Sequence, residues 1–157
     1  MRTYTATDDG GREIRYRDSK RYLWFLSALF PLLPFVGMAL MAATGAEWTL
    51  WLPLLGVYVV IPLLDLLFPN DANNPPEAVV PQLEADSYYR VLVHATVPLY
   101  FAVLITGAWF SVSQELSWFG LLGHALVTGA IGGIAVNTGH ELGHKKSSGD
   151  RVAARLA

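Results

Sequence analysis

Four long apolar stretches constrain the fold of this chain more than any other feature of its sequence. They cover residues 22–44, 48–68, 88–112 and 117–138, and each is about as long as the roughly 20 mostly apolar residues that a helix needs to cross a bilayer. Only 15% of the residues are charged, against about 25% in an average soluble domain. We therefore predict an all-α fold, a polytopic membrane helix bundle with four transmembrane helices, preceded by a polar segment over residues 1–21.

The basic residues predict the orientation of these spans. Six of the eleven precede the first span and four follow the last, whereas the connections at residues 45–47 and 113–116 have none. Because positively charged flanks stay on the cytoplasmic side, both termini and the loop at residues 69–87 are expected in the cytoplasm. The first stretch is too long for the apolar part of a cleavable signal peptide, and no A-x-A-like site closes it, so we expect it to remain as a membrane helix.

Charge and cysteine content exclude several classes of function. The formal net charge of -2 at pH 7 leaves no basic stripe for nucleic acid, so that partner is excluded. The chain has no cysteine, which rules out a disulfide framework and any thiolate metal site. A metal ion would have to be held by histidine, aspartate or glutamate.

The chemistry concentrates at the end of the fourth span, in the pattern His140-Glu141-Leu142-Gly143-His144. On a helix, His140 and His144 share one face with their Cβ atoms roughly 5–6 Å apart, so both imidazoles can bind one metal ion. Asn137 and Glu141 are candidates to hydrogen-bond to the ligating rings and hold them in place. Glu141 points about 100° away from His140, so the alternative is that it pairs with a basic or histidine group on a neighbouring helix.

Two other interpretations of this pattern stay open. H-E-x-x-H also occurs in zinc proteases, where the glutamate acts as general base, and intramembrane metalloproteases use such a motif in a membrane helix. A protease needs a third ligand, and the residues after His144 supply only Asp150. A non-catalytic membrane segment, in which the histidines bind nothing, is the third possibility.

Asp65 is the one charged residue within the second apolar stretch. An unpaired charge inside a membrane helix costs roughly 2.5–3.5 kcal/mol even on lenient scales, so we predict an ion pair with Arg90 or His94 at the start of the third span, or alternatively a contact that supports the metal ligands. The same side of the second span is predicted to line a channel for an apolar substrate, through Leu54, Val57, Tyr58 and Ile61.

Small residues predict where helices approach each other closely. The fourth span contains two small-xxx-small pairs, Gly129 with Gly133 and Gly139 with Gly143, and such pairs allow another helix to pack against the backbone. His124 lies 16 residues before His140, too far along the helix to bind the same metal ion. We expect it to be a hydrogen-bonded histidine of the helix bundle.

Three separated segments together resemble a known family. They are the run over residues 137–146, the end of the second span at Pro62-Leu63-Leu64-Asp65, and the loop Asn73-Asn74-Pro75-Pro76-Glu77-Ala78-Val79-Val80-Pro81-Gln82-Leu83-Glu84. In order and spacing they resemble the membrane-bound alkane monooxygenases, relatives of the integral-membrane fatty acid desaturases. The resemblance extends over nearly the whole chain from Tyr22 onward.

The resemblance implies a non-haem diiron enzyme of the bacterial inner membrane. Such an enzyme uses O2 and electrons from a rubredoxin-type donor to convert medium-chain or long-chain alkanes, or similar apolar substrates, into 1-alkanols. His140 and His144 would be iron ligands. Family members have about six spans and further histidine-rich boxes, so we expect residues 22–157 to be a desaturase-like or hydroxylase-like domain that is incomplete at its C-terminus. Residues 150–157 would begin the next, amphipathic segment, and most ligands of the two irons would lie outside this chain, which alone is expected to be inactive.

Overall fold

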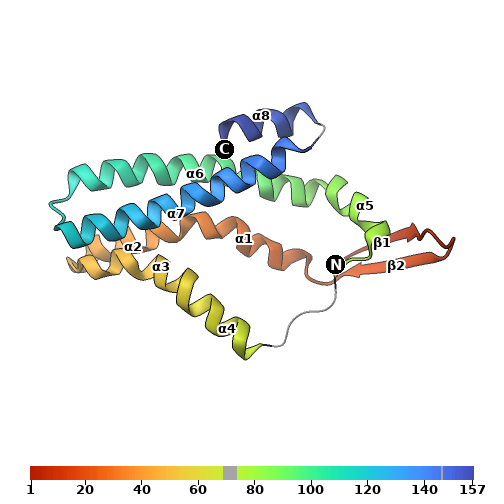
Figure 1. The fold of residues 1–157 in the computed structure, drawn as a ribbon, viewed down its shortest axis with the longest axis horizontal. Coiled ribbons are helices and arrows are strands. Elements are labelled where there is room, and N and C mark those ends of the chain that lie inside the picture. Colours follow the sequence, from red (N-terminus) through yellow and green to blue (C-terminus); the bar gives the residue numbers. More distant parts are fainter. Residues whose placement is uncertain (69–73, 146) are drawn as a thin grey trace.

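The computed structural model describes residues 1–68, 74–145 and 147–157, and it is a bundle of membrane-length helices (Figure 1). Four helical stretches are long and apolar enough to cross a membrane, over Arg21–Thr44, Glu47–Leu67, Ser87–Ser113 and Trp118–Gly143. These bounds confirm the four predicted spans and the all-α membrane fold. The fourth stretch continues beyond the predicted end, so His140 lies within the helix.

The first two spans are built from short segments, and prolines lie in the first turns of several of them. Proline is tolerated there because its missing N–H would be unpaired anyway. The segments of the first span are η1 (Arg21–Trp24), α1 (Phe25–Leu29), η2 (Phe30–Leu32) and α2 (Leu33–Thr44); those of the second are η3 (Glu47–Trp51), α3 (Leu52–Leu55), the π-helical η4 (Gly56–Val60) and α4 (Ile61–Leu67).

The third and fourth spans are continuous helices that pack side by side as the centre of the bundle. They are α6 (Ser87–Ser113) and α7 (Trp118–Gly143). Tyr100 and Val103 of α6 pack on Ile131 and Ala135 of α7 in one buried cluster. The α4 segment, in contrast, leads away from α6 and α7 (Figure 1), and most of its side chains are exposed.

Two short elements follow the second span within the predicted loop at residues 69–87. They are η5 (Glu77–Val79) and α5 (Val80–Ala85), after which Asp86 begins α6. Residues 69–73 of that loop lie outside the described residues. The described part of the loop is therefore largely helical.

A β-hairpin precedes the bundle, and the sequence analysis did not anticipate it. Strands β1 (Arg2–Thr7) and β2 (Glu13–Asp18) pair antiparallel with Tyr4 opposite Tyr16. The available signal was the Asp8-Asp9-Gly10-Gly11 turn between two runs that contain β-prone residues; Gly11 has a positive φ of 78°, which glycine adopts without strain. The hairpin and the start of α8 lie toward the same end of the bundle, whereas the C-terminus itself lies near the middle of its length (Figure 1). Whether that end is cytoplasmic stays a prediction.

The last helix, α8 (Ser148–Leu156), folds back against α7 and α6, and it confirms the predicted amphipathic segment. Its residue Ala154 lies close to Gly139 and Gly143: a Cβ at Gly139 would come within 3.2 Å of the Ala154 carbonyl oxygen. The prediction of close packing at this glycine pair is confirmed. The prediction for Gly129 and Gly133 is wrong within the described part of the chain, because a Cβ at either would meet no atom within 4 Å.

Candidate metal centre

The two histidines of the H-E-x-x-H pattern face each other at the end of α7. Their Nε2 atoms are 3.2 Å apart, and their ring planes are almost perpendicular at 89°. Two nitrogens that each lie about 2.0–2.1 Å from one ion, at a roughly tetrahedral angle, are separated by about 3.4 Å. His140 and His144 therefore fit two ligand positions of a single metal ion.

These two side chains do not form a complete metal site. Across residues 1–68, 74–145 and 147–157, no group of three or more histidine, cysteine, aspartate or glutamate side chains could hold a metal ion. Zinc and iron sites in proteins need at least three protein ligands in most cases. Further ligands would have to come from elsewhere.

The histidine pair lies on the face of α7 that is turned away from the bundle. His140 and His144 are exposed, as are Asn137 and Gly133 on the same helix face, whereas the opposite face contains the buried side chains Ile131, Ala135 and Leu142. At 3.6 residues per turn, positions 133, 137, 140 and 144 line up along one side of the helix. The face with the histidine pair is thus open to additional ligands.

Glu141 makes an ion pair with Lys145, at 3.2 Å. Lys145 also donates a hydrogen bond to Glu84 of α5 at 2.8 Å, and these contacts, that to Glu84 first, raise the pKa of Lys145. Glu141 was predicted to support a ligating histidine or to pair with a group on a neighbouring helix; it pairs instead with the residue four positions along its own chain. Asn137 is exposed beside the histidine pair.

The predicted ion pair of Asp65 is wrong. Asp150 at the start of α8 takes that place: its Oδ1 lies 2.6 Å from His94 Nε2 and 3.3 Å from Arg90. Asp65 is exposed on α4, which diverges from α6, so it stays away from both residues. The contact with His94 is the main reason why the pKa of Asp150 is lowered.

This exchange of partners gives a stability prediction. Asp150→Asn is expected to destabilise the protein by about 1–3 kcal/mol, since it removes a buried carboxylate that accepts several hydrogen bonds. The matched change Asp65→Asn, on an exposed side chain, is expected to stay within about 0.5 kcal/mol of the wild type. Denaturant unfolding in detergent micelles measures both. Equal destabilisation by the two variants would contradict the assignment.

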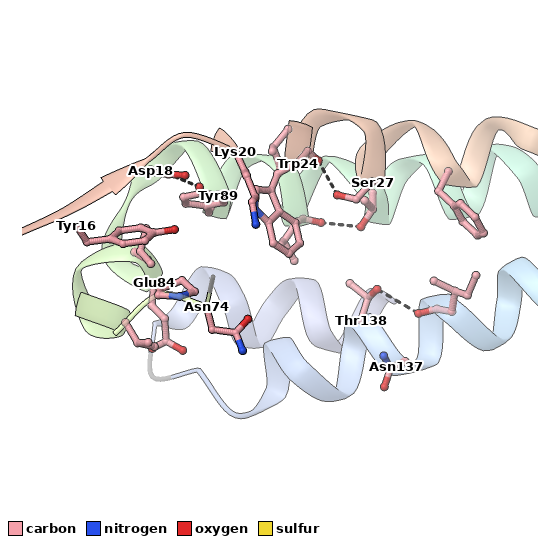
Figure 2. Close-up of a pocket in the computed structure, with 18 of the residues that line it drawn as sticks. Tyr16, Asp18, Lys20, Trp24, Ser27, Asn74, Glu84, Tyr89, Asn137 and Thr138 are labelled. Atoms are coloured by element: carbon pink, nitrogen blue, oxygen red, sulfur yellow. Dashed lines mark hydrogen bonds between the residues drawn. The ribbon is translucent and has the colours of Figure 1, made fainter. Parts of the chain in front are cut away.

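A second feature of the site region is a cavity of about 980 Å³ between α1, α6 and α7 (Figure 2). Tyr89, Thr96 and Tyr100 of α6 line it together with Trp24 and Thr138. The predicted channel residues Leu54, Val57, Tyr58 and Ile61 belong to the second span and are not among its described lining residues. The sequence patterns did not predict the cavity, because its walls come from β2, the first span, α5, α6 and α7, which are far apart in the sequence.

A buried ionic network, also missed, joins the hairpin to the bundle through Asp86. This carboxylate caps α6 by accepting from the Tyr88 N–H at 2.9 Å, and it accepts from Arg21 at 2.6 and 3.0 Å, from Tyr4 at 2.5 Å and from Arg2 at 2.9 Å. The hydrogen bonds from Arg21, above all, hold the pKa of Asp86 well below its usual range. The signal in the sequence was an aspartate directly before an apolar helix.

His124 behaves as predicted. It is 2% exposed, and its Nε2 lies 3.0 Å from the Gly107 carbonyl oxygen of α6. It is a structural histidine between the two central helices, far from His140.

The four membrane-length helices and the facing imidazoles of His140 and His144 define the class: a polytopic membrane protein with a pair of histidines at the end of its fourth span. No family model matches the chain. The chain is 49% identical to an alkane 1-monooxygenase of Ectopseudomonas oleovorans over 141 residues, which are 90% of this chain and 35% of that protein. It is 47% identical to alkane 1-monooxygenase 1 of Alcanivorax borkumensis over 143 residues, and 33% identical to an alkane 1-monooxygenase of Acinetobacter baylyi over 156 residues.

By this similarity the chain is a homologue of the alkane 1-monooxygenases over about 90% of its own length, as its sequence motifs predicted. It spans about a third of the length of these relatives, since the matched regions cover 35% to 37% of them. The incomplete metal site is consistent with that coverage.

Proposed function

We propose that this chain forms the first part of an enzyme that hydroxylates the terminal carbon of medium-chain or long-chain alkanes in the bacterial inner membrane. The observation that carries the proposal is the pair of facing Nε2 atoms, 3.2 Å apart, at the end of a membrane helix in a chain related to alkane 1-monooxygenases. His140 and His144 would hold iron together with ligands from outside the described residues.

The roles of the other residues follow from their positions. The exposed Asn137 lies one turn before His140 and two turns before His144, on the same face of α7. Its amide can therefore hydrogen-bond to a ligating ring. Glu141 forms an ion pair with Lys145. This pair holds the Lys145 ammonium group near the C-terminal end of α7, where cations interact favourably with the helix dipole. Leu54, Val57, Tyr58 and Ile61 stay candidates for the path of an apolar substrate out of the bilayer.

Iron, when bound, supplies the redox chemistry: one atom of O2 enters the terminal C–H bond, and the other leaves as water with two electrons and two protons. The electrons would come from a rubredoxin-type donor that reaches the cytoplasmic end of α7. The bilayer and the helices would exclude water from the alkyl chain of the substrate. They would also keep its terminal carbon near His140 and His144 at the end of α7.

The test is the metal identity and reaction of the protein expressed from its complete reading frame. We expect iron, without zinc, and O2-dependent conversion of dodecane to 1-dodecanol when a reduced rubredoxin-type donor is supplied. Zinc has no redox chemistry. Active protein with one zinc and no iron would overturn the proposal in favour of a metalloprotease, and protein that binds no metal would leave a non-catalytic membrane segment.

A further inference from the structure

The cavity beside α7 is separate from the histidine pair and is long enough to hold an alkyl chain. Tyr89 and Tyr100 both line it, and their separation of eleven positions along α6 corresponds to about 16 Å. Its volume of about 980 Å³ falls at the upper end of the roughly 300–1,000 Å³ that is typical of sites for small organic ligands.

The charged side chains of this cavity gather at one end, whereas the other end is uncharged and combines apolar walls with the hydroxyl groups of Ser27 and Thr138 and the amide of Asn137 (Figure 2). One end is polar, with Asp18, Lys20 and Glu84, which Figure 2 shows near the hairpin and α5. The walls further along include Leu92 and Ile134, with Val93 and Phe30 beside them. A molecule with one polar end and one alkyl chain would therefore lie parallel to the helices, with its polar end at the membrane surface.

Charges at the polar end favour an uncharged head group. Two carboxylates and one ammonium group line it, and both carboxylates already have partners: Asp18 accepts from Tyr89 at 2.5 Å, and Glu84 accepts from Lys145 at 2.8 Å. A carboxylate or phosphate head would meet like charges here, which is unfavourable. A hydroxyl, in contrast, can both donate to these acceptors and accept a hydrogen bond.

The cavity also adjoins the histidine face of α7. Asn137 and Thr138 both line it, and Figure 2 shows Thr138 pointing from α7 toward α1 while Asn137 lies further around the helix. Asn137 in turn shares the exposed face of His140 and His144. A molecule that leaves the histidine pair thus passes Asn137 on the way into the cavity.

We infer that this cavity binds a single-chain primary alcohol, with the hydroxyl group among Asp18, Lys20 and Glu84 and the alkyl chain along Leu92 and Ile134. The inference rests on the proposed function, in which such an alcohol is the product. The cavity is then the place from which the product passes to the cytoplasmic surface of the membrane.

Quenching of Trp24 fluorescence tests this inference, because Trp24 lines the cavity. The protein is placed in phosphatidylcholine nanodiscs and titrated with 2-bromo-1-dodecanol, whose bromine lies beside the hydroxyl group and therefore quenches a tryptophan at the charged end of the cavity, where Figure 2 shows Trp24 next to Lys20. We expect a saturable component of quenching that disappears in Trp24→Phe and persists in Trp109→Phe, since the exposed Trp109 reports only partition into the bilayer. Unlabelled 1-dodecanol should reverse the saturable component.

A matched pair of substitutions on α6 locates the binding site. Leu92→Phe narrows the cavity and is expected to weaken saturable binding about tenfold, the effect of roughly 1.4 kcal/mol, whereas Leu104→Phe, exposed and outside the described lining, should leave it unchanged. Equal effects of both variants, absence of a saturable component, or stronger competition by dodecanoic acid than by 1-dodecanol would overturn the inference. Saturable quenching of Trp24 by brominated phosphatidylcholine, unaffected by 1-dodecanol, would show a lipid site and overturn it as well.

These measurements do not depend on metal. A protein that binds the alcohol at Trp24 but contains no iron would contradict the proposed function alone. Iron-containing, active protein without saturable quenching would contradict only the assignment of the cavity.

Discussion

Replacing either His140 or His144 by alanine is expected to abolish metal binding at the end of α7. A single remaining imidazole cannot close the two-nitrogen site that the 3.2 Å separation forms. In the 157-residue chain itself, copper(II) nitrilotriacetate serves as the probe, because it has free coordination positions for two imidazoles on one helix face. Its binding should be lost in both variants, as measured by electron paramagnetic resonance.

In the protein expressed from its complete reading frame, the same substitutions should remove iron and alkane hydroxylation together. The loss of activity should exceed the roughly 10–100-fold that changes in residues behind the ligands typically cause. His124→Gln is the matched control: this histidine is buried against α6, so the variant should keep its metal content. Normal iron content in His140→Ala, or loss of iron in His124→Gln, would contradict the assigned ligands.

What the sequence predicted well depends on short-range patterns. The span bounds follow from helix length and hydropathy, and the facing of His140 and His144 follows from their spacing of four residues on a helix. His124 was correctly separated from the metal pair for the same reason. Each of these predictions needs only the geometry of a single helix.

What the sequence could not predict depends on which elements meet. Asp65 was predicted to pair with Arg90 or His94 from its charge and membrane depth, whereas the return of α8 onto α6 brings Asp150 within 2.6 Å of His94. The open face at Gly129 and Gly133 is a similar case, since a small-residue pair shows that a helix can approach but not that one is present. The cavity between α1, α6 and α7 also needs β2 and α5 to close it, and no local pattern encodes such an arrangement.

The second large effect is expected at Asp86, where a single carboxylate joins the hairpin to the membrane bundle. Its side chain is 1% exposed, and that of Arg21 is 11% exposed. Removing one partner of a buried ion pair typically costs about 3–5 kcal/mol, so Asp86→Ala should destabilise the protein by about that amount. Unfolding by guanidinium in detergent micelles measures the loss, and faster tryptic cleavage after Arg15 and Arg17 should show that the hairpin has detached.

Asp86→Asn separates the charge from the helix cap. Asparagine caps a helix about as well as aspartate does, so the Tyr88 N–H keeps its acceptor while Arg21 loses its counter-ion. We expect Asp86→Asn to be about 1 kcal/mol more stable than Asp86→Ala but still well below the wild type. Asp8→Asn is the control, because Asp8 pairs with the 86% exposed Arg12, and such surface pairs contribute about 1 kcal/mol or less.

The pH dependence gives Asp86 a signature that a packing defect would lack. The folded pKa of Asp86 is lowered from its ordinary value of 3.8, chiefly by the hydrogen bonds from Arg21. Its contribution to the free energy of unfolding is therefore fully present above pH 3.8 and is lost as the pH falls below that value toward the lower folded pKa. Because Asp86→Asn lacks the titrating group, the stability difference between wild type and variant should be constant from pH 7 to 5 and should narrow below about pH 3.8. A difference that stays constant down to pH 2.5 would show that the variant acts through packing and not through the charge of Asp86.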